Sequence, residues 1–323
     1  MPSPNAKATG TPRSAADGHA ILRAGPDPRG IATLPRALVH ACRQAGKRLK
    51  VADSLGTRLS GRDLLLRVLC AKRVLQRVLG AEERRVGVML PPTAGAVVVN
   101  AALALMGRVA VNLNYTTSQR ILDLSMERAG LAHVLSSPAF LERVKLDCGA
   151  RMMDSGELRK RLTPLDKAVA WIQAACLPLP VLERTLGLDR LRADDVLTVI
   201  FTSGSTGDPK GVVLSEENVA SNVRAIDALL HVSTSDVALG VLPFFHSYGY
   251  TATLWTPLVL DAGVVYHPNP LDAKAIGSLA AEHHATILMA TPTFLRTYLR
   301  RTAAEDFASL EAVFGSAEKL PRD

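Results

Sequence analysis

The sequence has 323 residues, of which 48% are hydrophobic, 21% are charged and 4% are aromatic. These values are typical of a globular chain with about two domains and a large core, and they exclude wholesale disorder, collagen and a small disulfide scaffold. The net charge of +8 is uneven: residues 1–85 hold 17 basic and 6 acidic residues, whereas the remainder holds 21 and 24. Many of these basic residues follow a helical period after Ser60, with no aromatic residues between them. We therefore expect a solvated helix face and no nucleic-acid partner.

Residues 1–30 are rich in Pro, Gly and Ala and lack periodicity, which predicts a disordered leader. We expect residues 31–323 to form one large unit, with subdomains at about 31–190 and 191–323. The first twenty residues contain no apolar segment typical of a secretory signal, and no apolar run approaches the ~20 residues that span a bilayer. The expected location is therefore cytoplasmic. The four cysteines are far apart in the sequence, which favours isolated reduced thiols over a zinc site.

From Leu34 onward, helical patterns alternate with short runs of β-branched and aliphatic residues. These runs predict strands near 85–90, 109–113, 133–136, 196–201, 237–242, 264–266 and 286–289, and an apolar helix over 94–106. Strands that alternate with helices are typical of layered folds with largely parallel sheets. The sequence therefore predicts an α/β fold.

The segment 162–192 interrupts this alternation. It combines an apolar stretch over 168–180 with Lys and Arg residues on both sides. Two interpretations remain open. We favour a buried connector helix between the two subdomains over a peripheral contact with the inner face of the membrane.

The most informative segment is a ten-residue loop that directly follows the predicted strand 196–201. Its sequence over 202–211 is Thr-Ser-Gly-Ser-Thr-Gly-Asp-Pro-Lys-Gly. The glycines permit tight turns and close approach of the backbone to a ligand, while the hydroxyl groups, backbone N–H groups and Lys210 suit phosphate oxygens. The loop differs from a Walker A loop, because Pro209 stands where that pattern needs glycine and a second strand over 212–214 precedes the next helix. The pattern predicts a site for a triphosphate or pyrophosphate.

This loop resembles the signature loop of the adenylate-forming (AMP-binding) superfamily, which includes acyl-CoA synthetases and peptide-synthetase adenylation domains. The resemblance extends from about Leu34 to the last residue. It is greatest to fatty-acyl ligases, in particular the ligase half of bifunctional acylglycerophosphoethanolamine acyltransferase/acyl-ACP synthetases. It implies the N-terminal domain of such an enzyme, with alternating α-β-α-β-α layers. The other segments that carry the resemblance are 53–60, 86–91, 109–114, 242–250 and 291–294.

The resemblance implies ATP-dependent activation of a carboxylic acid to an acyl-adenylate, followed by thioester formation with CoA or acyl carrier protein. The expected acid is a medium- or long-chain fatty acid, and Mg²⁺ is the expected companion of ATP. Lys210 and His246 are the implied catalytic residues, and Thr206 is the implied Mg²⁺ ligand. The implied ATP phosphate ligands are Thr202, Ser203, Gly204, Ser205, Thr206, Gly207 and Lys210. The implied acyl pocket consists of Phe245, His246, Tyr248 and Gly249, and the implied adenine or acyl-adenylate contacts are Gly315, Ser316, Ala317 and Glu318.

The superfamily pattern also includes features for which this sequence has no counterpart: a Tyr-Gly-x-Thr-Glu motif, a later Asp for the ribose, and a small C-terminal domain with a Lys. We therefore expect a C-terminally truncated fragment that is inactive alone. Two alternatives remain open: a non-catalytic remnant that binds a nucleotide or a protein partner, and an adenylating enzyme for an aryl or amino acid.

Overall fold

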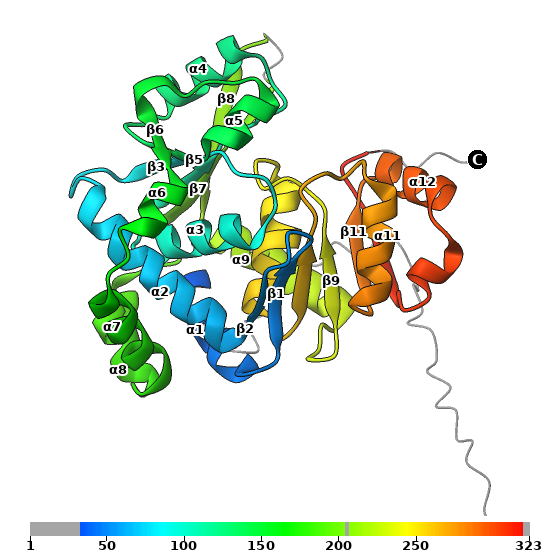
Figure 1. The fold of residues 1–323 in the computed structure, drawn as a ribbon, viewed down its shortest axis with the longest axis horizontal. Coiled ribbons are helices and arrows are strands. Elements are labelled where there is room, and N and C mark those ends of the chain that lie inside the picture. The colour runs from blue at the N-terminus through cyan, green and yellow to red at the C-terminus, as the bar shows by residue number, and fades with distance from the viewer. Residues whose placement is uncertain (1–32, 204–206, 319–323) are drawn as a thin grey trace, which may run out of the picture.

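The computed structural model describes residues 33–203 and 207–318, which form two six-stranded sheets with helices between and outside them (Figure 1). The predicted leader over 1–30 lies outside the described residues. The expected strands and the apolar helix are all present, which confirms the predicted α/β fold. Within the described ranges, no helix is both long and apolar enough to cross a membrane.

Sheet A has the strand order β12-β11-β9-β10-β1-β2, and sheet B has the order β6-β5-β3-β4-β7-β8. Neighbouring strands are parallel, except that β2 runs antiparallel to β1 and β8 antiparallel to β7. The strands of sheet A are β1 (Leu49–Asp53), β2 (Arg58–Ser60), β9 (Val237–Gly240), β10 (Gly263–Tyr266), β11 (Ile287–Ala290) and β12 (Ala312–Gly315). Those of sheet B are β3 (Arg85–Val88), β4 (Val109–Asn112), β5 (Val134–Ser136), β6 (Met152–Asp154), β7 (Val196–Ser203) and β8 (Pro209–Ser215).

The helices connect these strands and cover the sheets. The α-helices are α1 (Leu34–Ala45), α2 (Gly61–Val78), α3 (Ala94–Ala104), α4 (Gln119–Arg128), α5 (Pro138–Val144), α6 (Ser155–Lys160), α7 (Pro164–Ala175), α8 (Leu179–Leu186), α9 (Glu216–Leu230), α10 (Thr256–Val259), α11 (Ala273–Glu282) and α12 (Pro292–Arg301). The 3-10 helices are η1 (Gly149–Arg151), η2 (Leu188–Arg190) and η4 (Ala304–Phe307), and η3 (Gly249–Trp255) is a π-helix.

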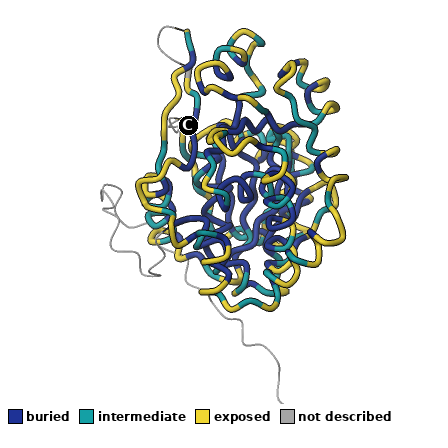
Figure 2. The backbone as a smooth tube through the Cα atoms, turned by 90° about the vertical axis from the view of Figure 1, so that its left-hand side faces the viewer, coloured by how far each residue is buried: buried dark blue, intermediate teal, exposed yellow. Residues whose placement is uncertain are grey.

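Three hydrophobic clusters define the layers. The central cluster contains buried residues of both sheets, and α3 contacts β3 and β4 of sheet B as well as β1 of sheet A. A second cluster packs α11 against sheet A, and a third packs α4 and α5 against sheet B. The order is therefore α-β-α-β-α, as the resemblance implies. Figure 2 shows the buried backbone gathered in the interior, with the exposed segments around it.

Local sequence explains where the helices that flank the site begin. Ser60 and Asp63 form a capping box at the start of α2, and Ser215 and Asn218 form one at the start of α9. Each box satisfies two backbone N–H groups that the first helical turn leaves without partners. Strand β8 therefore passes directly into α9 at a defined residue, Glu216, which fixes the base of the loop hairpin.

The two sheets share strands across the expected boundary near residue 190. The N-terminal hairpin of β1 and β2 joins sheet A, whose other strands all follow residue 236. Conversely, β7 and β8 complete the sheet that β3 to β6 begin. The subdomain boundary stays a prediction, and each sheet contains strands from both sides of it.

Candidate functional site

The predicted phosphate loop connects β7 to β8, which pair as an antiparallel hairpin. Thr202 stands opposite Lys210, and Ser203 opposite Pro209. Because directly opposed residues of neighbouring strands share one face, the side chains of Thr202 and Lys210 flank the loop together. Both residues are exposed. The remaining expected ligands of the loop tip, Gly204, Ser205 and Thr206, lie outside the described residues.

Two features of the hairpin suit an anionic ligand. Gly207 has a φ of +84°, a left-handed backbone conformation that residues with a side chain rarely adopt. The side chain of Lys210 has no hydrogen-bond or ion-pair partner within 33–203 and 207–318. Its ammonium group can therefore donate to a ligand without first breaking a contact to a described residue.

Helix α4 holds the base of the loop. Asp208 forms ion pairs with Arg120 (Oδ1 to Nη2, 3.4 Å) and Arg128 (Oδ2 to Nη2, 3.1 Å), and Arg128 also donates to the carbonyl oxygen of Pro209. The acidic residue of the loop is thus paired with α4. Sequence reasoning missed these arginines, because they lie 88 and 80 residues before Asp208 and no local pattern marks them.

The motif over 242–250 follows β9 and leads into η3, a π-helix. Gly249 is required there, because a Cβ atom at this position would lie 2.1 Å from the carbonyl oxygen of Pro243. Phe245 is buried, and its ring meets that of Tyr115 edge to face at 4.7 Å between centroids. Turns of π-helix are rare in proteins, and those that do occur are often found at functional sites. The strict packing therefore gives this motif a fixed shape.

His246 lies beside this buried ring, with 4.4 Å between its centroid and that of Phe245. Solvent reaches the imidazole, but the surrounding protein buries it in part and thereby lowers its pKa from the ordinary value of 6.5. The ring is therefore neutral at pH 7. A neutral imidazole can orient a substrate by hydrogen bonding, but it adds no positive charge.

Tyr248 joins this motif to the end of β12. Its hydroxyl donates a hydrogen bond of 2.8 Å to the carbonyl oxygen of Phe314, directly before Gly315. The structure therefore brings the implied acyl motif and the implied adenine segment together. The segment continues through half-buried Ser316 and through Ala317, whose φ of +71° is unusual for a residue with a side chain. Strained backbone of this kind clusters at functional sites.

Glu318, the last residue of this segment, contacts the start of α12. Its Oε2 atom accepts hydrogen bonds from the backbone N–H (3.1 Å) and the hydroxyl (2.6 Å) of Thr293. The hydroxyl bond in particular lowers the pKa of Glu318. The carboxylate is thus ionised and caps a helix, which leaves the backbone of the segment as the surface available to a ligand.

The phosphate hairpin lies apart from this segment. Figure 1 shows β8 alongside α4, whereas β12 lies beside β11 at the other side of the molecule. Within the described ranges, no hydrogen bond or ion pair joins residues 202–210 to residues 315–318. The structure therefore assembles the acyl and adenine parts and leaves the phosphate hairpin as a separate part.

Sequence reasoning also missed Tyr115, which follows β4. Its hydroxyl is buried without a hydrogen-bond partner in the described part of the chain, and its ring contacts both Phe140 and Phe245. Burial raises the pKa of this phenol, so the hydroxyl stays protonated and can donate. Within the ranges that the structure describes, no group of three or more His, Cys, Asp or Glu side chains could hold a metal ion.

Comparison with known proteins agrees with this geometry. The model of the AMP-binding enzyme family matches residues 38–323, so the chain belongs to that family. The N-terminal domain of FACL13 from Mycobacterium tuberculosis has the same fold, with a TM-score of 0.74 at 19% sequence identity over 90% of this chain and 71% of that one. The predicted superfamily is thereby confirmed.

Several curated proteins are similar in sequence. The acyl-CoA ligase SID4 of Ajellomyces capsulatus is 26% identical over 238 residues, which are 69% of this chain and 40% of that protein. The 4-coumarate–CoA ligase 3 of Oryza sativa subsp. japonica is 32% identical over 40% of this chain and 24% of that protein. The long-chain-fatty-acid–CoA ligase of Bacillus subtilis is 28% identical over 39% and 23%, respectively. The chain thus spans less than half the length of these relatives.

Proposed function

We propose that the protein containing this chain activates a carboxylic acid with ATP and passes the acyl group to a thiol. The observation that carries this proposal is the β7–β8 hairpin, where exposed Thr202 and Lys210 flank the loop and Lys210 has no partner in the described part of the chain. In the first step a carboxylate oxygen attacks the α-phosphorus of ATP, and pyrophosphate leaves with the electron pair of the broken P–O bond. In the second step a thiolate attacks the acyl carbon, and AMP leaves.

The residues of this chain act in that scheme mainly by positioning and by compensating charge. Both reactants are anions, so cationic and N–H groups that hold the departing pyrophosphate lower the barrier. We assign this role to Lys210 and to the loop residues 202–207. Neutral His246 orients the carboxylate, and the backbone after Gly315 contacts the adenine.

Mg²⁺ fits this arrangement. In phosphoryl-transfer sites the ion binds mainly to substrate phosphates and water, with one or two protein oxygens, so it needs no cage of acidic side chains. We propose the hydroxyl of Thr206 as the protein oxygen. When bound, the ion neutralises charge on the β- and γ-phosphates.

We further propose a medium- or long-chain fatty acid as the substrate, as in the fatty-acyl and acyl-ACP ligases that the sequence resembles. The aromatic, uncharged surroundings of His246 support an apolar substrate, and so does the similarity to a long-chain-fatty-acid–CoA ligase. The similarity to a 4-coumarate–CoA ligase supports the aryl alternative. CoA is the acceptor that the names of these relatives support, and acyl carrier protein is the second candidate.

The test is ATP–pyrophosphate exchange by the full-length protein with a panel of acids, followed by thioester formation with CoA or acyl carrier protein. Exchange that rises with aliphatic chain length supports the fatty-acid proposal, and exchange with 4-coumarate only supports the aryl alternative. If no acid of the panel supports exchange, the adenylation proposal is wrong.

We also propose a cytoplasmic location with a peripheral membrane contact through residues 162–192. The acidic side chains of the α7–α8 hairpin face the protein: Asp166 accepts hydrogen bonds from Arg73 (2.9 Å) and Arg77 (2.7 Å), and Glu183 forms an ion pair with Arg36 (2.9 Å). These contacts fix the hairpin against α2 and α1. They also remove its negative charge from the outer surface.

The outer surface of this hairpin combines apolar and basic side chains. Lys167 and Arg184 are exposed beside the exposed apolar residues Leu165, Trp171, Ile172 and Val181. Such a combination is typical of helices that lie in the interface of an anionic membrane. Figure 1 shows α7 and α8 at the periphery of the molecule, where a flat surface could reach them.

A further inference from the structure

A cavity lies between α2, α3 and α6, outside the site described above. Its volume is about 660 Å³, within the range of small-molecule sites. None of its lining residues belongs to the phosphate hairpin, to the motif over 242–250 or to the segment after β12. The cavity therefore has no part in the adenylation scheme proposed above.

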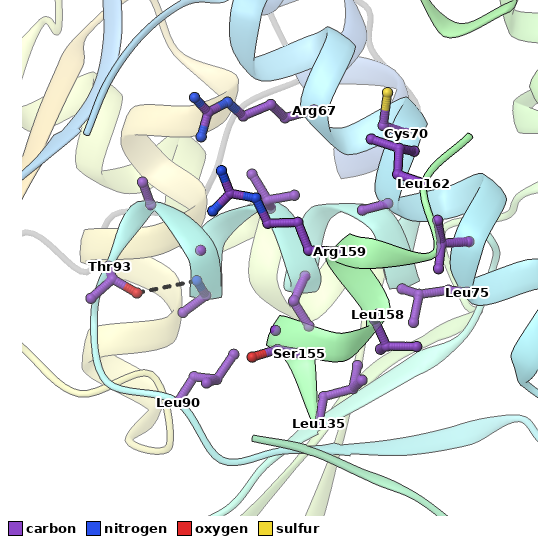
Figure 3. Close-up of a pocket in the computed structure, with 18 of the residues that line it drawn as sticks. Arg67, Cys70, Leu75, Leu90, Thr93, Leu135, Ser155, Leu158, Arg159 and Leu162 are labelled. Carbon is purple, nitrogen blue, oxygen red and sulfur yellow. Dashed lines mark hydrogen bonds between the residues drawn. The ribbon is translucent and has the colours of Figure 1, made fainter. Parts of the chain in front are cut away.

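The walls of the cavity are apolar. Helix α2 contributes Cys70, Val74 and Leu75, and α3 contributes Val98 and Val99. Leucines from β5, from α6 and from neighbouring loops complete the walls, as Figure 3 shows for Leu90, Leu135, Leu158 and Leu162. Val98 and Val99 remain partly exposed although they pack against the central core. An apolar ligand would remove this surface from water, which favours binding.

The charged residues that line the cavity are all basic. They are Arg67 on α2, Arg159 on α6 and Lys167 on α7, and no acidic residue lines the cavity. All three are exposed, and none of their side chains has a hydrogen bond or ion pair with another described residue. In Figure 3 the side chains of Arg67 and Arg159 extend toward the same side of the cavity.

Asp166, an acidic residue next to Lys167, already forms ion pairs with two other arginines. Arg73 and Arg77, about two and three turns beyond Arg67 on α2, share the carboxylate of Asp166. The single carboxylate of Asp166 is therefore shared by these two arginines, while the side chains of Arg67 and Arg159, at the edge of an apolar cavity, have no ion pair with a described residue. Guanidinium groups pair with carboxylates through two parallel hydrogen bonds, so this arrangement is complementary to an anion that carries an apolar chain.

We propose that this cavity binds a free long-chain alkyl carboxylate, with its chain between α2 and α3 and its carboxylate at Arg67 and Arg159. A single apolar compartment with a cationic rim matches one chain and one anionic head group. Affinity grows with chain length, by about tenfold for each two methylene groups that the cavity buries. The site is separate from the proposed catalytic site, so binding here does not depend on adenylation.

The experiment uses palmitate with a photoreactive diazirine on its chain, and mass spectrometry of the cross-linked peptides. We expect cross-links in α2 and α3 that excess palmitate abolishes, while hexadecanol and hexadecyltrimethylammonium compete at least tenfold less well. Cross-links confined to η3 would show binding at the proposed acyl site only and would overturn the inference. The absence of any cross-link would overturn it as well.

Paired variants test the rim and the walls. Arg67→Gln with Arg159→Gln is expected to weaken palmitate binding at least tenfold, whereas the matched control Arg62→Gln with Arg300→Gln, which removes two exposed charges elsewhere, leaves it unchanged. Ala71→Phe fills the cavity from α2 and is expected to abolish the cross-links, and Val98→Phe does so from α3 if the first variant fails to fold. Equal binding by the rim variant and its control would refute the assignment.

Discussion

The hydroxyl of Tyr248 donates a 2.8 Å hydrogen bond to the carbonyl oxygen of Phe314, and this bond connects the two parts of the proposed adenylate site. The donor belongs to the segment that enters η3, and the acceptor belongs to β12. The distance between His246 and Gly315 therefore depends on a contact that neither segment makes by itself.

We predict that Tyr248→Phe weakens both stability and substrate binding. The change leaves the Phe314 carbonyl without its donor, which costs about 1 kcal/mol in the free energy of unfolding. Urea unfolding measures that loss, and the KM for the acid in the full-length protein measures the loosened site. Tyr298→Phe is the matched control, because Tyr298 donates a similar bond of 2.9 Å to Pro270. It should lower stability by a similar amount and leave KM unchanged, and an equal rise in KM for both variants would contradict the prediction.

Lys210→Ala is expected to lower the affinity for ATP about tenfold or more, because a charged hydrogen bond to phosphate is worth about 1.5–3 kcal/mol. Stability should not change, since the Lys210 side chain has no partner in the described part of the chain. Titration of the full-length protein with ATP measures the effect. Lys274→Ala, which removes an exposed lysine on α11, serves as the control. An unchanged ATP affinity in Lys210→Ala would show that the hairpin is not the phosphate site.

Glu216 is expected to make stability depend on pH. Burial raises its pKa from 4.5 to about 8, and the N–H of Leu34 donates to its Oε2 at 3.0 Å. Between about pH 4.5 and pH 8 the unfolded chain releases this proton while the folded chain keeps it. The free energy of unfolding therefore falls as the pH rises through this window, by a few kcal/mol at most.

Glu216→Gln should remove this component, because the amide cannot ionise and its oxygen can still accept from Leu34. Chemical unfolding at several pH values between 4 and 9 measures it. Glu305→Gln, at an exposed glutamate of η4, should leave the pH profile as it is. The prediction fails if the profile of Glu216→Gln matches that of the wild type.

The outer face of α7 and α8 is expected to bind anionic vesicles. Trp171 is 52% exposed, whereas Trp255, the other tryptophan of the sequence, is fully buried, so a fluorescence change on binding reports Trp171. We expect a blue shift with vesicles containing phosphatidylglycerol, a weaker one in high salt and none with pure phosphatidylcholine. Lys167→Gln with Arg184→Gln should weaken binding. Lys274→Gln, a control on α11, should not, and a spectrum that vesicles do not change would exclude the contact.

Much of the fold could be predicted because its signals are local. The strands before and after the loop, the capping box at Ser60 and the start of α9 after Ser215 each depend on residues within a few positions of one another. For 162–192 the sequence favoured one buried connector helix, and that expectation was wrong: the segment contains the two helices α7 and α8, and Trp171 and Ile172 are exposed. Which side of these helices faces outward depends on the contacts of Asp166 with α2 and of Glu183 with α1, and those contacts join distant segments.

The rest depends on contacts between distant segments. The pairing of Asp208 with α4, the ring contact of Tyr115 with Phe245 and the bond of Tyr248 to β12 join residues 66 to about 130 positions apart. Side-chain chemistry allows each contact but does not select it among the alternatives. The cavity at α2 is a further example, because its volume is a property of how helices pack and not of any one segment.

Sheet A joins the early strands β1 and β2 to strands that come much later in the sequence, and this has a consequence during synthesis. The segment Leu49–Asp53 leaves the ribosome about 210 residues before its partner strand Gly263–Tyr266, to which it bonds in the finished sheet. At 5–20 residues per second this interval is about 10–40 s. During that time the apolar edge of the N-terminal hairpin has no native partner. Strand β1 can therefore complete its pairing with β10 only after residue 266 has been made, and it needs protection from aggregation until then.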